Sequence, residues 1–307
     1  MNKYLKISSS RSQLALFLLL IGAAWIVAII LSSVILIAKL GVPVSGHASM
    51  DLSDPRLNGI LKPLQGLSTI IIFGVPALLF ARFTYRSRNL YFLGFRKAEK
   101  NGFYILAVAI LLLSFPLEGW LGQLNRGIPL PDWMLRMEGD ADKQISVFLK
   151  ADSTLDIINN IFIIALLPAI CEEACFRGVL QRILIRTFKS PWMGIIVTAA
   201  FFSAFHMQFQ GFLPRMFLGI LLGAIYWYSG SLWTSILAHF FTNGVQVVAA
   251  SFYPKMITEN PSVPLFAALI SMVIVVGLLS VMRGQSKVTY SGVYDLENLQ
   301  DFDEFPG

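Results

Sequence analysis

The chain has 307 residues, of which 56% are hydrophobic and only 14% are charged. An average soluble domain has about a quarter charged residues, so this composition excludes an ordinary soluble domain and indicates an integral membrane protein. The net charge is +6. The Lys and Arg residues lie at the ends of apolar runs, with no dense basic stripe among aromatic residues. This pattern favours loop anchors at a cytoplasmic membrane surface over nucleic-acid binding.

Eight apolar segments are candidates for membrane-spanning helices, each of which needs roughly 20 mostly apolar residues. The first follows a basic stretch and is too long for the apolar core of a cleaved signal peptide, so we expect it to stay in the mature protein. The fourth and fifth are short or interrupted. The predicted fold is all-α, a polytopic membrane bundle of about eight transmembrane helices with an intramembrane cavity. The segments are 14–38, 66–83, 102–121, 157–171, 192–207, 211–228, 232–252 and 264–282.

The basic residues test this arrangement, because cytoplasmic loops of membrane proteins carry an excess of Lys and Arg. If every segment crosses once, four basic stretches fall on one side and the acidic loop 131–144 falls on the other. The sequence therefore predicts a multi-pass protein of the plasma (inner) membrane, in contact with the lipid bilayer, with both termini cytoplasmic. The basic residues are Lys3, Lys6, Arg11, Arg82, Arg86, Arg88, Arg96, Lys97, Lys100, Arg177, Arg182, Arg186, Lys189, Arg283 and Lys287.

Ionisable side chains inside apolar segments cost on the order of 2.5–3.5 kcal/mol each, so each one calls for an explanation. We expect such ionisable side chains in three of the eight predicted segments. One such residue alone can serve as a polar contact between helices. Several of them within 172–243 instead indicate a functional site. The polar set is Glu172, Glu173 and Arg177 at the end of the fourth segment, His206 in the fifth, and His239 with Asn243 in the seventh.

Helical spacing separates the two glutamates. Glu173 and Arg177 are four residues apart, so they can form an ion pair along one helix face. Glu172 is turned about 100° away and lacks that partner. We therefore expect Glu173 to be neutralised and structural, and Glu172 to face a polar cavity.

The histidines follow the same geometry. His206 comes four residues after Phe202, and Asn243 comes four after His239, so each pair projects from one helix face. A buried carboxyl group beside an imidazole can take a proton from water and later return it. The other imidazole and the amide can donate hydrogen bonds to a developing oxyanion. Alternatively, Glu172, His206 and His239 could bind a divalent metal ion such as zinc, which would activate the water.

Three further features are interpreted as structural. Cys171 and Cys175 are expected to be packing residues without a mutual disulfide, with metal binding as the minor alternative. Gly219 and Gly223 form a GxxxG pair, which predicts a seam of close helix packing. His47 lies in a predicted loop and is interpreted as incidental.

Three short motifs resemble a known family pattern. "EEACFRG" (172–178) resembles the EExxxR motif of the CAAX-processing and bacteriocin-immunity family of intramembrane proteases, also called CPBP or Abi. "FSAFH" (202–206) fits its FxxxH motif and "HFFTN" (239–243) fits its HxxxN/D motif. The motifs occur in the family's order, and the resemblance covers about 155–250.

The resemblance implies a helical bundle whose conical cavity opens to the membrane and cytoplasm, with a hydrolase activity like that of a CAAX protease. By resemblance, Glu172 and His206 activate the attacking water, and His239 and Asn243 stabilise the oxyanion. Support comes from Glu173, Arg177 and Phe202. The family is conventionally called a metalloprotease, yet its residues also permit a metal-free, glutamate-dependent mechanism, so the expected cofactor is one zinc ion or none.

The expected partner is a membrane-associated peptide or protein, CAAX-like or a leader peptide, cut on the cytoplasmic side. The sequence then divides into three parts. Residues 1–150 hold N-terminal transmembrane helices and loops, 151–255 the CPBP-type catalytic core, and 256–307 the last transmembrane helix with an acidic cytoplasmic tail.

Other classes of function remain open. Intramembrane Glu and His also serve as proton sites in transporters, and a protein of this fold could be a non-catalytic immunity or scaffold protein. No inverted repeat or pair of Gly/Pro-broken segments supports a transporter. Other intramembrane proteases fit less well. HExxH is absent, Tyr294 and Asp295 lack a GxGD partner, and Ser231 lacks the context of a rhomboid nucleophile.

Overall fold

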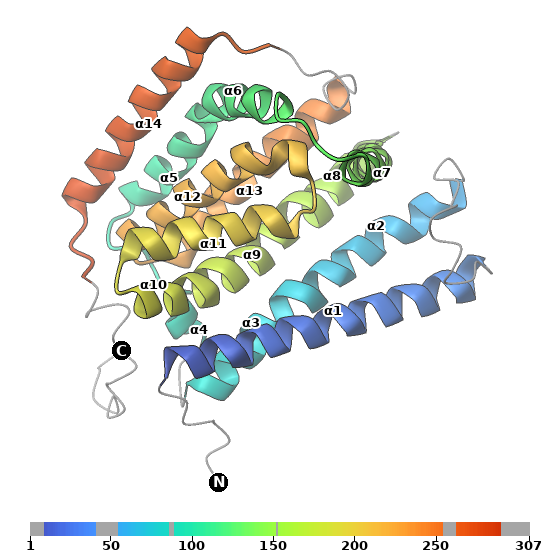
Figure 1. The fold of residues 1–307 in the computed structure, drawn as a ribbon, viewed down its shortest axis with the longest axis horizontal. Helices are drawn as coiled ribbons and strands as arrows, with labels where there is room; N and C mark the ends of the chain where they lie inside the picture. Colours follow the sequence, from blue (N-terminus) through green and yellow to red (C-terminus); the bar gives the residue numbers. More distant parts are fainter. Residues whose placement is uncertain (1–8, 41–54, 86–88, 152, 254–261, 290–307) are drawn as a thin grey trace.

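The computed structural model describes residues 9–40, 55–85, 89–151, 153–253 and 262–289, whose regular elements are all helical (Figure 1). His47 and the acidic tail from residue 290 lie outside the described residues. The predicted fold class is confirmed, because seven helices among the described residues are long and apolar enough to cross a membrane. The fifth predicted segment is a shorter apolar helix, α11 (Pro191–Phe205).

The outer helices of the bundle, such as α1 (Ser10–Leu40) and α14 (Leu265–Gln285), have apolar side chains on their exposed faces. Leu19 and Val273 are 69% and 68% exposed, as expected for side chains that face acyl chains. Outside the fourth crossing and α11, the membrane helices are α1 (Ser10–Leu40), α2 (Pro55–Thr69) continued by η2 (Ile70–Gly74) and α3 (Val75–Thr84), α5 (Gly102–Leu113) continued by α6 (Phe115–Arg126), α12 (Phe212–Ser229), α13 (Leu232–Phe252) and α14 (Leu265–Gln285). The short helix α4 (Asn89–Leu93) precedes α5.

The fourth crossing differs most from its prediction. The sequence predicts an end at Cys171, but the helix runs for 35 residues from Thr154 to Phe188. Glu172 therefore lies near the middle of a membrane helix and not at a shallow end. The motif does not end the helix because its charges are compensated inside the protein. The crossing consists of α8 (Thr154–Asn160), α9 (Leu167–Glu173) and α10 (Arg182–Phe188), joined by the π-helical stretches η3 (Ile161–Leu166) and η4 (Ala174–Gln181).

The sequence predicts a loop for the acidic stretch 131–144. In the structure, residues 132–144 instead belong to helix α7 (Asp132–Leu149). This helix is seen nearly end-on in Figure 1, at the right-hand end of the bundle. It is amphipathic and carries charges, so a search for membrane-length apolar runs does not detect it.

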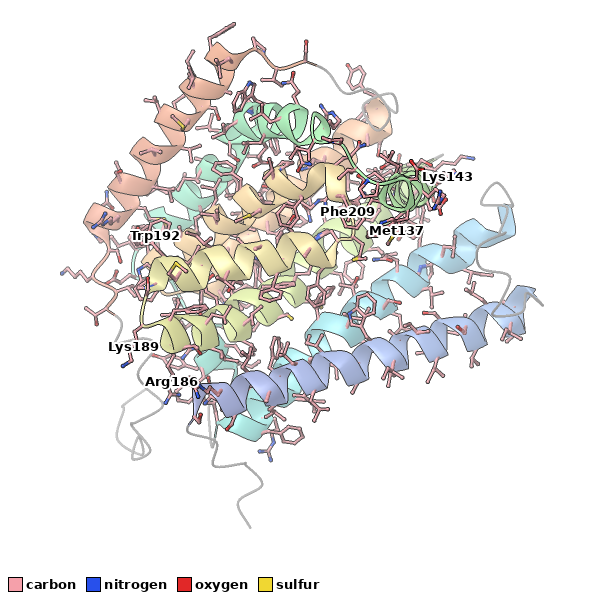
Figure 2. The ribbon with its side chains drawn as sticks, in the orientation of Figure 1. Met137, Lys143, Arg186, Lys189, Trp192 and Phe209 are labelled. Carbon is pink, nitrogen blue, oxygen red and sulfur yellow. The ribbon has the colours of Figure 1, made fainter. Side chains whose placement is uncertain are left out.

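The two ends of the bundle carry different segments (Figure 2). Arg186, Lys189 and Trp192 lie at one end, whereas Met137, Lys143 and Phe209 lie at the other. We call these the basic end and the α7 end.

Gly219 and Gly223 of α12 form the predicted close-packing seam. A Cβ on Gly219 would lie 2.9 Å from the Cβ of Ala199, and one on Gly223 would lie 2.7 Å from Oε1 of Gln181. The bare backbone also presents its carbonyls. The carbonyl of Gly219 accepts a hydrogen bond from Arg177 Nη2 at 3.0 Å, and that of Gly223 accepts one from Gln181 Nε2 at 3.1 Å. The seam therefore holds the fourth crossing as well as α11.

Candidate active site

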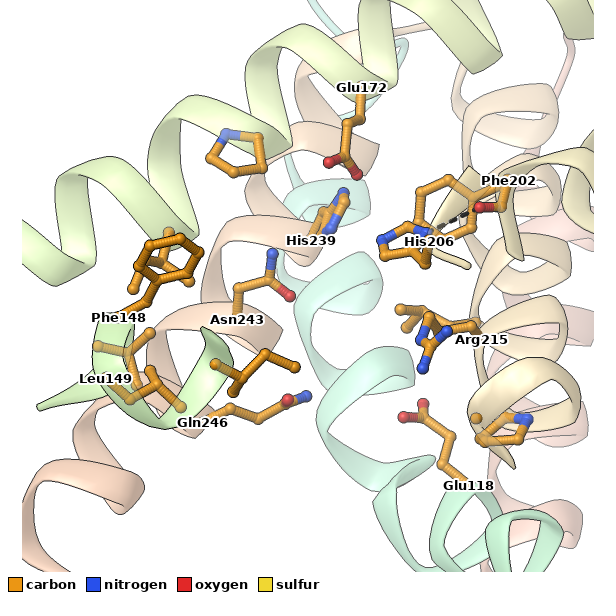
Figure 3. A pocket seen from close by; sticks show the side chains of 17 residues that line it. Glu118, Phe148, Leu149, Glu172, Phe202, His206, Arg215, His239, Asn243 and Gln246 are labelled. Carbon is orange, nitrogen blue, oxygen red and sulfur yellow. Dashed lines mark hydrogen bonds between the residues drawn. The ribbon is translucent and has the colours of Figure 1, made fainter. Parts of the chain in front are cut away.

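A cavity of about 410 Å³ is lined by residues of the fourth crossing, α6, α7, α11, α12 and α13 (Figure 3). It brings together Glu172, His206, His239 and Asn243, which the sequence places in three separate segments. In Figure 3 the carboxylate of Glu172 and both imidazoles converge on one part of the cavity, with the Asn243 amide beside them. The aromatic ring of Phe202 also lines this part.

The adjacent Glu172 and Glu173 have different surroundings, as helical spacing predicts. Glu172 lines the cavity. Within the described part of the chain, no group forms a hydrogen bond to its carboxylate. Glu173 is fully buried away from the cavity. A carboxylate without a protein partner beside a cavity has oxygen atoms free to hold water or substrate.

Glu173 is the centre of a buried polar network. Its Oε1 accepts a hydrogen bond from Arg177 Nη1 at 2.7 Å and another from His239 Nδ1 at 2.9 Å. The predicted ion pair with Arg177 is thus confirmed. The Arg177 guanidinium also lies 4.6 Å from the ring centroid of Phe202. The sequence does not predict the second role of Glu173, which is to orient His239. Because Nδ1 donates to Glu173, Nε2 of His239 is left for the cavity.

His206 lies directly after α11, in a short connection to α12. Its Nδ1 donates to the Phe202 carbonyl at 2.8 Å, which leaves Nε2 for the cavity. The next residue, Met207, has a left-handed backbone with φ 53°. Side chains of α7, α11 and α12 hold this connection, so the imidazole is fixed without a helical backbone. The hydrogen bonds run from Ser203 Oγ to Phe212 O, from Arg215 Nη1 to Gln208 O, and from the N–H groups of Phe209 and Gln210 to Glu138 Oε2.

Sequence reasoning missed two charged residues of the cavity, Glu118 of α6 and Arg215 of α12. The expectation of ionisable groups in only three spans was therefore wrong. The signal was available, because each is an ionisable residue within a predicted apolar segment. No motif marked either one. Figure 3 shows the Arg215 guanidinium and the Glu118 carboxylate near each other, away from Glu172. Glu118 also accepts a hydrogen bond from Ser114 Oγ.

Glu172, His206 and His239 are of the residue types that bind zinc. Across the described ranges, however, no three His, Cys, Asp or Glu side chains are placed to hold one metal ion. Cys171 and Cys175 are buried free thiols, as expected for packing residues, and they do not line the cavity.

A comparison with protein-family models supports the motifs. Residues 154–245 match the model described as type II CAAX prenyl endopeptidase Rce1-like. The matched segment, which is less than half of the chain, is therefore similar to the CPBP family. A search of curated proteins and a search of solved structures gave no match.

The matched CPBP segment begins at α8 and ends within α13, so it holds every site residue that the sequence predicts. The similarity of this segment to the CPBP family supports CAAX-type intramembrane proteolysis as the kind of function of this multi-pass membrane protein. The part of the cavity beyond the predicted site residues is lined by Glu118, Arg215 and side chains of α7. Arg215 lies within the matched segment, whereas Glu118 and α7 lie outside it.

Proposed function

We propose that the protein is an endopeptidase that hydrolyses a peptide bond of a membrane-associated substrate, CAAX-like or a leader peptide, by a water that Glu172 and His206 activate. One observation carries this proposal: Glu172, His206, His239 and Asn243 line the same cavity. The free carboxylate of Glu172 supplies the proton acceptor that hydrolysis needs.

The first step is attack by water. A water molecule held between the Glu172 carboxylate and Nε2 of His206 attacks the substrate carbonyl carbon while its proton passes to Glu172. His206 can accept a hydrogen bond at Nε2 because its Nδ1–H is engaged by the Phe202 carbonyl. Glu172 then returns the proton to the leaving nitrogen as the C–N bond breaks.

The oxyanion that forms on the substrate needs hydrogen-bond donors. The amide of Asn243 and Nε2–H of His239 fill this role. His239 donates from Nε2 when both ring nitrogens carry protons, and the Glu173 carboxylate at 2.9 Å from Nδ1 supplies the counter-charge. Arg177 pairs with Glu173 at 2.7 Å and holds its carboxylate in place.

Cleavage of membrane-anchored fluorogenic peptides by the purified protein tests this proposal. Glu172→Gln should lower the rate about 10²–10⁴-fold, because the amide cannot accept the water proton. The matched control is Glu99→Gln, which changes a carboxylate that accepts a hydrogen bond from Lys287 N and does not line the cavity. Gel filtration should show both variants folded. Equal cleavage by wild type and Glu172→Gln would contradict the mechanism and favour a non-catalytic immunity or scaffold protein, or a transporter.

A further inference from the structure

The cavity extends from the middle of the bundle toward the α7 end. Glu172 lies near the middle of the fourth crossing and His239 lies in the third turn of α13, and the remaining lining residues continue from there toward the α7 end. α12 contributes residues of its first two turns, and the antiparallel α13 contributes residues from His239 onward. Neither α10 nor residues 219–229 of α12 and 232–238 of α13 provide any lining residue among those described.

The basic end has the composition of a cytoplasmic surface. Lys and Arg concentrate on the cytoplasmic side of membrane proteins. By the order of the helices, ten described Lys and Arg side chains belong to segments toward the basic end, compared with six in segments toward the α7 end. The ten are Arg11, Arg82, Arg96, Lys97, Lys100, Arg182, Arg186, Lys189, Arg283 and Lys287. The six are Lys39, Lys62, Arg126, Arg136, Lys143 and Lys150.

The α7 end has the features of a membrane–water boundary. Lys143 and Asp140 form an ion pair at 3.4 Å with side chains 69% and 79% exposed, which requires contact with water. Trp133 of the same helix is 49% exposed, as is common where a tryptophan lies at a membrane surface. Other side chains of α7, Ile145 and Phe148, line the cavity. The cavity therefore extends to the helix that carries this surface.

We propose that the cavity opens on the extracytoplasmic side of the membrane, so that the substrates are membrane-anchored polypeptides presenting the bond to be cut from that side. This inference rests on the proposed function. It replaces the expectation of a shallow cytoplasmic site, because Glu172 lies mid-helix and the open space beyond it leads away from the basic end.

The wall between Glu172 and the α7 end fits an extended peptide. Arg215 and the exposed amide of Gln246 can donate hydrogen bonds to peptide carbonyls, and Glu118 can accept them from peptide N–H groups. Apolar side chains of α7 lie opposite, where they can receive apolar residues of the substrate. A peptide needs both kinds of contact, since its backbone is polar throughout.

Labelling with a membrane-impermeant maleimide tests the direction of opening. Single cysteines are placed at Gln246 in the cavity, at Lys143 on α7 and at Lys97 at the basic end, with Cys171 and Cys175 replaced by alanine. Should that background not fold, the native cysteines can stay, since they are 7% and 1% exposed, and labelling is then read as the excess over wild type. Intact cells expose the outer face, and inside-out vesicles expose the cytoplasmic face.

We expect pretreatment of intact cells to abolish later labelling of Gln246→Cys and Lys143→Cys, and to leave Lys97→Cys unchanged. Labelling of Gln246→Cys only in inside-out vesicles would overturn the inference. The inference would also be overturned if Lys143→Cys were labelled from outside and Gln246→Cys were labelled from neither face. The cavity would then be closed at the α7 end. Labelling does not depend on catalysis, so absence of peptide cleavage by purified wild type would overturn the proposed function alone.

Discussion

The two glutamates on neighbouring faces of one helix, Glu172 and Glu173, have opposite surroundings. The closed side consists of Glu173, Arg177 and their partners His239 and Gly219, joined by hydrogen bonds of 2.7–3.0 Å. The open side consists of Glu172, which faces the cavity together with His206 and Asn243. On the closed side every charge is compensated by the protein, whereas on the open side the compensating groups must come from water or substrate. The comparison shows how one membrane helix can carry a free carboxylate while the neighbouring residue makes the structural contacts.

The largest effect is expected on the closed side. Arg177→Met should lower the free energy of unfolding by about 3–5 kcal/mol, because it leaves the Glu173 carboxylate buried without its ion-pair partner. The thermal unfolding midpoint in detergent measures this loss. Arg283→Met, at an exposed site, should leave the midpoint unchanged. The double variant Glu173→Gln with Arg177→Met should be more stable than Arg177→Met, and a less stable double variant would contradict the pairing.

On the open side, Asn243→Ala should lower the cleavage rate about 10²–10³-fold and leave the unfolding midpoint near that of wild type. The reason is that one donor to the oxyanion is lost while the closed side stays intact. Asn101→Ala, at an exposed helix start, is the matched control. If Asn243→Ala lost stability and activity together, the division between the two sides would fail at this residue.

A smaller effect is expected at the seam behind the closed side. Gly219→Ala should cost about 1–3 kcal/mol of unfolding free energy, because the new methyl group would lie 2.9 Å from the Cβ of Ala199. Activity should fall with it, since the Gly219 carbonyl helps to hold Arg177. The control is Gly277→Ala in α14, where an added Cβ meets no atom within 4 Å. An unchanged midpoint for Gly219→Ala would show that α11 and α12 can separate freely.

No effect is expected from chelation. If Glu172 and His206 activate water directly, dialysis against EDTA or 1,10-phenanthroline should leave the cleavage rate of the purified protein unchanged. A loss of activity that added zinc restores would instead assign Glu172, His206 and His239 to a metal ion. The same treatment of Glu172→Gln controls for cleavage by a contaminating metalloprotease.

The sequence predicts much of this structure because membrane helices and their polar residues leave strong local signals. Long apolar runs locate the crossings, and the four-residue spacing of Glu173 and Arg177 is enough to predict their ion pair. The bond between Glu173 and His239 is not predictable in this way, because it joins residues 66 positions apart on different helices.

The errors have physical causes too. The continuation of the fourth crossing to Phe188 depends on acceptors from α12, such as the Gly219 carbonyl, which no local pattern reveals. Helix α7 is amphipathic and lacks a membrane-length apolar run. Glu118 and Arg215 belong to no motif, and they become meaningful only when the bundle places them in one cavity.

The position of Glu173 and Arg177 on a single helix has a consequence for biosynthesis. Membrane helices are inserted as the chain is made, and helices that follow later in the sequence arrive later. The fourth crossing must therefore enter the bilayer before α12 and α13 can offer the Gly219 carbonyl and His239. Because the ion pair is internal to the helix, at 2.7 Å, its two charges are already matched at that moment. The counter-ion of Glu173 is thus part of the same helix during insertion. Glu172, in contrast, obtains its cavity only when the later helices have packed against the fourth crossing.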